Sequence, residues 1–145
     1  MNAQEVALVW FQRLWNEKDV SVIRELSHPE ATGYTEGGIT RSWDDLESQL
    51  FLPLVTAFPD IRVDCEAVTG SESDAVVRWQ AVGTHLGELP GVPASGRRIR
   101  FEGLTWLSVR DGKIVEGWDR WNLNALLAVM SGGPDSQTAR VVAAE

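Results

Sequence analysis

The pattern of apolar and polar positions divides the chain into a first part with helical periodicity and a second part with strand periodicity. Within residues 4–16, apolar groups recur three or four positions apart, which predicts an amphipathic helix. A short helix is predicted over 20–26 and a further helix over 42–58, with Ser42 able to cap the latter and Pro53 expected to kink or split it. The N-terminal half is therefore expected to be mainly helical.

From residue 61 onward, apolar residues alternate with polar ones, as they do in half-buried strands. The predicted strands cover residues 32–35, 61–65, 74–85, 98–110 and 113–121. Asp111-Gly112 is a two-residue turn signal between the last two of these, and a closing helix is predicted over 123–130. Helices followed by antiparallel strands indicate an α+β fold, with a curved sheet wrapped around the N-terminal helices. Residues 1–131 are expected to form one domain, followed by a mobile tail over 132–145.

Composition and charge narrow the classes of partner. The chain has 145 residues, with 13 basic and 21 acidic side chains, a net charge of −8 that argues against nucleic acid or an anionic membrane. No apolar run approaches the ~18 residues of a membrane span, and the N-terminus lacks a secretory signal pattern, so a cytoplasmic protein is expected. Cys65 is the only cysteine, and His28 and His85 are isolated, so no metal site is predicted.

Three segments carry a family resemblance that covers about residues 4–130. They are AFPDIRVD at 57–64, VVRWQAVGTHLGELPGVPASGRRIRFEG at 76–103 and DGKIVEGW at 111–118. In this order they resemble the SnoaL-like polyketide cyclases of the NTF2-like superfamily. The resemblance implies a cone-shaped barrel with a deep apolar cavity, a homodimer, and no cofactor. It also implies aldol-type cyclisation or isomerisation, or hydration, of an apolar polyketide- or terpenoid-like molecule.

Asn122 decides how far this functional prediction extends. The resemblance places it where the family typically has its catalytic aspartate, and an amide takes no proton near neutral pH. Asn122 would still orient a carbonyl or hold a water in the cavity. The alternatives are a binding protein that has kept the cavity and lost the carboxylate, or an assembly or regulatory subunit.

Side-chain alternation offers a test that does not need the family. If Asn122 points inward, Arg120, Trp118 and Glu116 point inward too, which leaves Trp121 on the outer face. An inward Arg78 and Gln80 likewise leave Trp79 outside, and a dimer through the outer sheet face would cover the two exposed indoles. The reverse parity buries Trp79 and Trp121 and puts Asn122 on the surface. We expect the first arrangement.

These considerations give a set of candidate site residues. The predicted catalytic groups are Asn122, His85 as proton carrier, and Arg78 to hold an anionic or enolate substrate. Glu102 and Glu116 are secondary candidates for the missing carboxylate. The predicted substrate-binding residues are Gln80, Trp118, Arg120, Tyr34 and Trp15.

An epoxide hydrolase is a less favoured reading. The resemblance to that branch of the superfamily would match its Arg-x-Asp element to Arg78-Trp79-Gln80, with Asn122 at the second carboxylate. Amides would then stand at both acidic positions. They could position a water but could not accept its proton.

Overall fold

The computed structural model describes residues 1–89 and 91–143, and it confirms the α+β architecture. The helical segments are α1 (Ala3–Phe11), η1 (Gln12–Asn16), α2 (Val22–Leu26), α3 (Trp43–Asp45), η2 (Leu46–Phe51), α4 (Leu52–Ala57) and α5 (Leu123–Met130), where η marks a π-helical turn. The strands are β1 (Ser27–Thr35), β2 (Gly38–Thr40), β3 (Arg62–Gly70), β4 (Asp74–Thr84), β5 (Arg98–Arg110), β6 (Lys113–Trp121) and β7 (Ala139–Val141).

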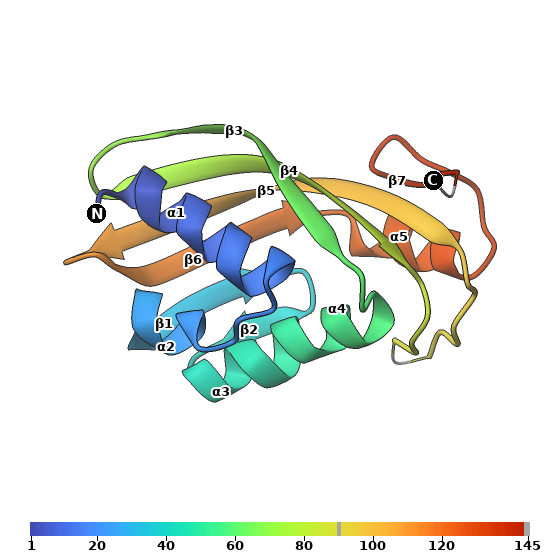
Figure 1. The fold of residues 1–145 in the computed structure, drawn as a ribbon, viewed down its shortest axis with the longest axis horizontal. Helices are drawn as coiled ribbons and strands as arrows, with labels where there is room; N and C mark the ends of the chain where they lie inside the picture. The colour runs from blue at the N-terminus through green and yellow to red at the C-terminus, as the bar shows by residue number, and fades with distance from the viewer. Residues whose placement is uncertain (90, 144–145) are drawn as a thin grey trace.

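The seven strands of the described residues form one curved sheet, in which six follow the order β2-β1-β6-β5-β4-β3 and β7 pairs with β5 outside this order (Figure 1). Its neighbouring strands pair antiparallel, except that β1 and β6 run parallel. β5 and β6 have the predicted bounds, and the Asp111-Gly112 turn joins them with positive φ at both residues. This turn geometry matches the twist of a two-residue hairpin and fixes the register of β5 against β6.

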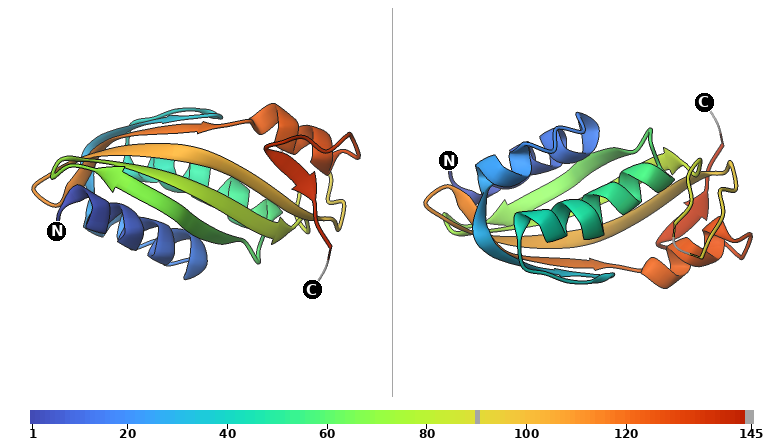
Figure 2. Two further views of the ribbon diagram at one scale, coloured as in Figure 1. Left: turned by 90° about the horizontal axis from the view of Figure 1, so that it is seen from above. Right: turned by 90° about the horizontal axis from the view of Figure 1, so that it is seen from below.

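Helices cover one face of this sheet and leave the other open. Figure 2 shows α1 and the α3–α4 segment on the same side of the sheet, with α5 at the end far from the N-terminus. The core lies between that face and the helices. Val6, Trp10 and Leu14 from the first helical segment are buried there, beside Val77 of β4 and Leu107 of β5. The apolar stripe read from the sequence is therefore the stripe that packs on the sheet.

The long helical segment after Ser42 begins as predicted but is not broken by its proline. The Ser42 hydroxyl accepts a hydrogen bond from the backbone N–H of Asp45 at 3.1 Å, which caps α3. Pro53 lies at the start of α4, directly after the π-helical turn η2. The wider turn accommodates the residue, and α3 to α4 remain one continuous helix (Figure 1).

The segment expected to be a mobile tail contains a strand. β7 pairs with Ile99–Phe101 of β5, beyond the point where β6 ends and α5 begins. The side chain of Ala139 is fully buried there. In the described part of the chain, no helix is long and apolar enough to cross a membrane.

Candidate active site

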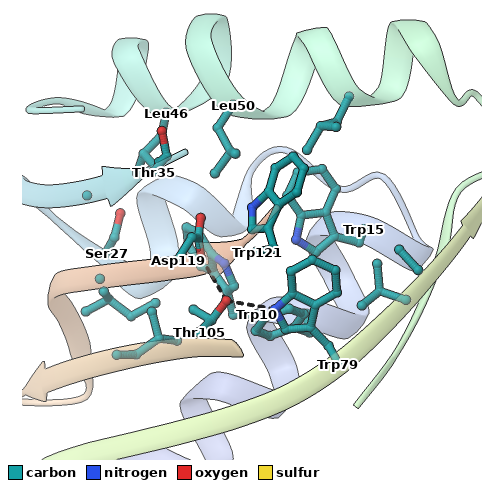
Figure 3. Close-up of a pocket in the computed structure, with 18 of the residues that line it drawn as sticks. Trp10, Trp15, Ser27, Thr35, Leu46, Leu50, Trp79, Thr105, Asp119 and Trp121 are labelled. Atoms are coloured by element: carbon teal, nitrogen blue, oxygen red, sulfur yellow. Dashed lines mark hydrogen bonds between the residues drawn. The ribbon is translucent and has the colours of Figure 1, made fainter. Parts of the chain in front are cut away.

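A deep cavity lies between the covered face of the sheet and the helices, with an empty volume of about 840 Å³ including its mouth (Figure 3). Its aromatic lining is Trp10, Phe11, Trp15, Trp79, Phe101 and Trp121. Its other apolar side chains are Ala31, Leu46, Leu50, Leu54, Ile61, Val63, Ala81, Leu107 and Ile114. The remaining lining residues are Ser27, Thr32, Gly33, Thr35, Thr105, Gly117 and Asp119. Among them, Asp119 is the one ionisable group.

Strand parity brings Asp119 into the cavity. Gly117, Asp119 and Trp121 of β6 line it, whereas Arg120 between them is exposed. On β4, Trp79 is buried and Arg78 is exposed. The expected parity is therefore wrong, and the reverse arrangement holds. The physical reason is burial, because the inner face takes the indoles of Trp79 and Trp121 out of water.

A short chain of hydrogen bonds links Asp119 to Thr105 and Trp79. The Trp79 indole Nε1–H donates to the Thr105 hydroxyl oxygen at 2.9 Å, and the Thr105 hydroxyl donates to Asp119 Oδ1 at 2.7 Å (Figure 3). An indole N–H is a donor only, so the Thr105 hydroxyl must accept from it and use its own hydrogen toward Asp119. Oδ1 is thereby occupied. Oδ2 is left to bind or release a proton on the cavity side.

The surroundings of Asp119 change its acidity. Burial in the apolar cavity raises the pKa of Asp119 to about 6, because the charged form loses its water. The hydrogen bond from Thr105 opposes this by favouring the carboxylate. The field of Glu36 raises the pKa further, and that of Arg120 lowers it. A carboxyl group with a pKa near 6 can both accept and donate a proton at physiological pH.

Asn122 lies outside the cavity. It is exposed at the end of β6, and its side-chain oxygen accepts a hydrogen bond from the backbone N–H of Ala125 at 2.9 Å. This is the N-cap of α5, a position where asparagine is strongly preferred. The expectation that Asn122 points into the cavity is therefore wrong. Its amide type fits the helix cap and has no bearing on the cavity's carboxylate.

His85 is fully buried but does not line the cavity. Its Nδ1 lies 2.8 Å from the Ser95 hydroxyl and accepts the backbone N–H of Ser95 at 3.2 Å, which ties the end of β4 to the loop before β5. Its ring packs against Phe58, which also packs against the cavity residue Phe101. Burial lowers the pKa of His85, so the neutral ring is favoured. The structure therefore places this candidate proton carrier away from the cavity.

Most of the other predicted residues lie on the outer face of the sheet. Arg78 and Arg120 are exposed, and Gln80 lines a polar groove with Arg62 and Arg100. Tyr34 and Trp118 stack on each other, with ring centroids 5.7 Å apart. Glu102 and Glu116 do not line the cavity either. Of the predicted substrate-binding residues, Trp15 is the one that does.

The site residues that sequence reasoning missed include Asp119 and Thr105, and also Trp79 and Trp121, which were expected on the outer face. Side-chain alternation carried a signal for Asp119, because it lies two residues before Trp121 and therefore on the face opposite Asn122. The cost of exposing Trp79 and Trp121 on one face argued for that placement. An asparagine directly before an apolar helix is also an N-cap signal. In the part of the chain that the structure describes, no three His, Cys, Asp or Glu side chains cluster as metal ligands would.

Comparison with known proteins identifies a matching family and similar solved structures. Residues 5–129 match the family described as SnoaL-like polyketide cyclase. AclR, a candidate hydroxylase from Streptomyces galilaeus, is 28% identical with a TM-score of 0.77, over 90% of this chain and 97% of that one. IdmH, a candidate polyketide cyclase from Streptomyces antibioticus, is 26% identical with a TM-score of 0.75, over 88% and 96%.

A candidate SnoaL-like polyketide cyclase from Jannaschia sp. CCS1 is 24% identical with a TM-score of 0.81, over 90% of this chain and 92% of that one. It shares the fold. Proteins with curated descriptions include none that is significantly similar. The family match spans most of the chain and contains both the cavity strands and the covering helices, so this protein belongs to the SnoaL-like polyketide cyclase family.

Proposed function

We propose that the protein is a cofactor-free cyclase or isomerase in which Asp119 moves a proton within an apolar small-molecule substrate. The observation that carries this proposal is a single carboxyl group in a mainly apolar cavity rich in aromatic rings, with a pKa raised to about 6. Such a group suits both halves of an acid/base reaction, because it gains and loses a proton easily near neutral pH.

The reaction that fits is an intramolecular aldol closure. The Asp119 carboxylate takes a proton from a carbon next to a carbonyl, and the resulting enolate carbon attacks a second carbonyl of the same molecule. The new alkoxide then takes the proton back from Asp119. Atoms and charge balance without a cofactor, and the carboxylate is restored. Thr105 keeps Oδ1 occupied throughout, so Oδ2 is the atom that handles the proton.

The cavity also bears on the two alternative functions, a binding protein and an epoxide hydrolase. The argument for a binding protein is that the amide of Asn122 replaces the family's carboxylate. This argument loses its force because Asp119 supplies a carboxylate in the cavity. An epoxide hydrolase of the considered type needs an arginine and two carboxylates around a water. The described residues that line this cavity include one carboxylate and no arginine.

A model reaction tests the proposal without the native substrate. Deuterium exchange at the α-carbons of 2-tetralone, an apolar bicyclic ketone, reports proton abstraction by NMR. We expect the exchange rate to rise with pH to a plateau, with half the plateau reached near pH 6. Asp119→Asn should lower it about 10²- to 10⁴-fold, the usual range for loss of a general base.

A matched control separates this effect from a general loss of charge. Asp111→Asn changes an exposed aspartate in the β5–β6 turn, where asparagine also favours the turn geometry. It should leave the exchange rate unchanged. Equal exchange rates in the Asp119→Asn variant and the unchanged protein would overturn the proposal.

We also propose that the outer sheet face forms a homodimer interface. Leu104 and Trp106 of β5 are 46% and 50% exposed, and Trp106 packs against Trp118, which stacks on Tyr34. This apolar group, which we call the outer aromatic patch, comprises Tyr34, Leu104, Trp106 and Trp118. An exposed patch rich in aromatic rings is typical of an interface. The indoles that were expected to form it, Trp79 and Trp121, lie in the cavity.

A further inference from the structure

Among the described residues, no basic side chain lines the cavity or forms an ion pair with its carboxylate. Its ionisable lining residue is Asp119, and the lining contains no lysine, arginine or histidine in the described part of the chain. The neighbouring Arg120 does not pair with it. The Arg120 guanidinium donates to the backbone carbonyl of Asp119 at 2.8 Å and lies on the exposed side of β6. Above pH 6, the ionised Asp119 therefore accepts a hydrogen bond from Thr105 but has no ion-pair partner among the lining residues.

The walls around this charge also favour a positive ligand. Four tryptophans, Trp10, Trp15, Trp79 and Trp121, line the cavity with Asp119 and lie together on one side of it in Figure 3. Trp79 and Trp121 meet edge to face, with centroids 6.4 Å apart, so their rings present differently oriented surfaces to the cavity. The face of an indole is the aromatic surface that attracts cations most strongly. Tryptophan rings together with a carboxylate are the components from which aromatic cages for alkylated ammonium groups are built, and both line this cavity.

We propose that this cavity selects ligands in which a tertiary or quaternary ammonium group is joined to an apolar body. The ammonium group lies against the indole faces near Asp119, and the body fills the aliphatic part of the cavity. This inference rests on the proposed function, because it assigns the substrate class of the same cavity. A cation placed there also keeps Asp119 ionised, so that Oδ2 remains able to accept a proton.

Three probes that share one ring test the charge preference. They are benzyltrimethylammonium, benzyl alcohol and phenylacetate, and binding is followed by quenching of the cavity tryptophans. At pH 7.5 we expect the cation to bind about 10-fold or more tightly than the alcohol, as for a desolvated cation–π site. Phenylacetate should show no binding. Equal affinities for the cation and the alcohol would overturn the proposal.

The pH dependence identifies the group responsible. Protonation of Asp119 near pH 6 should weaken cation binding about 10-fold between pH 7.5 and pH 5.0, whereas alcohol binding stays constant. The charged groups whose fields reach Asp119 are Glu36 and Arg120. A cation affinity that does not change with pH would contradict the proposal.

Variants then separate this proposal from the proposed function. Asp119→Asn should abolish the preference for the cation and keep alcohol binding, and Asp111→Asn should change neither. Trp121→Phe should weaken the cation more than the alcohol, and Trp121→Leu more still. If Asp119→Asn removes ketone exchange while the unchanged protein shows no cation preference, the proposed function stands and this inference fails. If the cation preference is present and exchange is absent, the inference stands and the acid/base role fails.

Discussion

The two faces of the sheet carry similar residues in opposite environments. On the inner face, Asp119 accepts a hydrogen bond from Thr105, which in turn accepts one from Trp79. On the outer face, Asp74 accepts hydrogen bonds directly from the hydroxyl of Ser108 and from the indole N–H of Trp106 at 3.0 Å. Each face thus combines an aspartate, a hydroxyl and a tryptophan, but the outer aspartate collects more donors and remains in contact with water.

The acidities of the two carboxyl groups move in opposite directions. Burial raises the pKa of Asp119 to about 6. Hydrogen bonds from Ser108, Trp106 and Ser73 lower the pKa of Asp74 below its usual value. The comparison shows that residue type alone does not determine acid/base chemistry. The difference comes from access to water and from the number of donors.

The largest expected difference between the two faces is in how folding stability responds when the charge of Asp119 or of Asp74 is removed. The folded-state pKa of Asp119 lies above its unfolded value, so folding stability declines as pH rises from about 4 to 6. Asp119→Asn removes this penalty and should stabilise the protein at pH 7.5, by up to about 3 kcal/mol for a shift of about two pKa units. The gain in stability should vanish below pH 4, where the protonated Asp119 of the unchanged protein is neutral, as the asparagine of the variant is. Urea denaturation at several pH values measures it.

Asp74→Asn provides the opposite case. The pKa of Asp74 is lowered in the folded protein, so its charge adds stability above the unfolded pKa, and this is lost as pH falls through the folded value. Its substitution should therefore slightly destabilise the protein at pH 7.5. A stabilising effect of Asp74→Asn, or a destabilising effect of Asp119→Asn at that pH, would break the comparison.

The hydroxyl groups should differ in the same way, with a smaller effect. Thr105→Val leaves the buried Trp79 N–H without an acceptor and Asp119 without a donor, which should cost about 1–3 kcal/mol. It should also raise the pKa of Asp119 further and shift the exchange profile to higher pH. Ser108→Ala, its matched control on the outer face, leaves Asp74 with two other donors and water. Equal costs for the two variants would contradict this account.

The smallest expected effect concerns the outer aromatic patch. Leu104→Glu adds a charge to its exposed surface and should convert the proposed dimer to monomers with little change in the unfolding free energy of the chain. Sedimentation velocity measures the change. Lys113→Glu, at the exposed far end of β6, is a control that should keep the dimer. A monomeric unchanged protein would rule out this interface.

Much of the fold was accessible from the sequence because its signals are local. The Asp111-Gly112 turn and the alternation on both sides of it predict β5 and β6 to the residue. The parallel pairing of β1 with β6, and the short strand β7, depend on contacts between distant segments. The three residues of β7 are too few to show a periodicity, so the sequence carries no local signal for this strand.

The site was harder to predict because it depends on which face of β6 is buried. The prediction that Asn122 points inward assigned the wrong face of β6 to the cavity, so every predicted site residue on β6 lies outside it. Trp79 is buried and Trp121 is partly buried, and this removal of indole surface from water is the physical criterion that decides the parity. The pKa of Asp119 could not be predicted at all, because it arises from desolvation by residues of several elements.

The most direct test of this account is the pKa of Asp119 itself. The ¹³C signal of its carboxyl carbon can be followed by NMR from pH 3 to pH 8 and assigned by its absence in Asp119→Asn. We expect a midpoint near 6, with the Asp74 signal titrating below its ordinary value in the same sample. A midpoint for Asp119 at or below about 4, the value of an ordinary exposed aspartate, would contradict the central claim that this cavity prepares its carboxyl group for proton transfer.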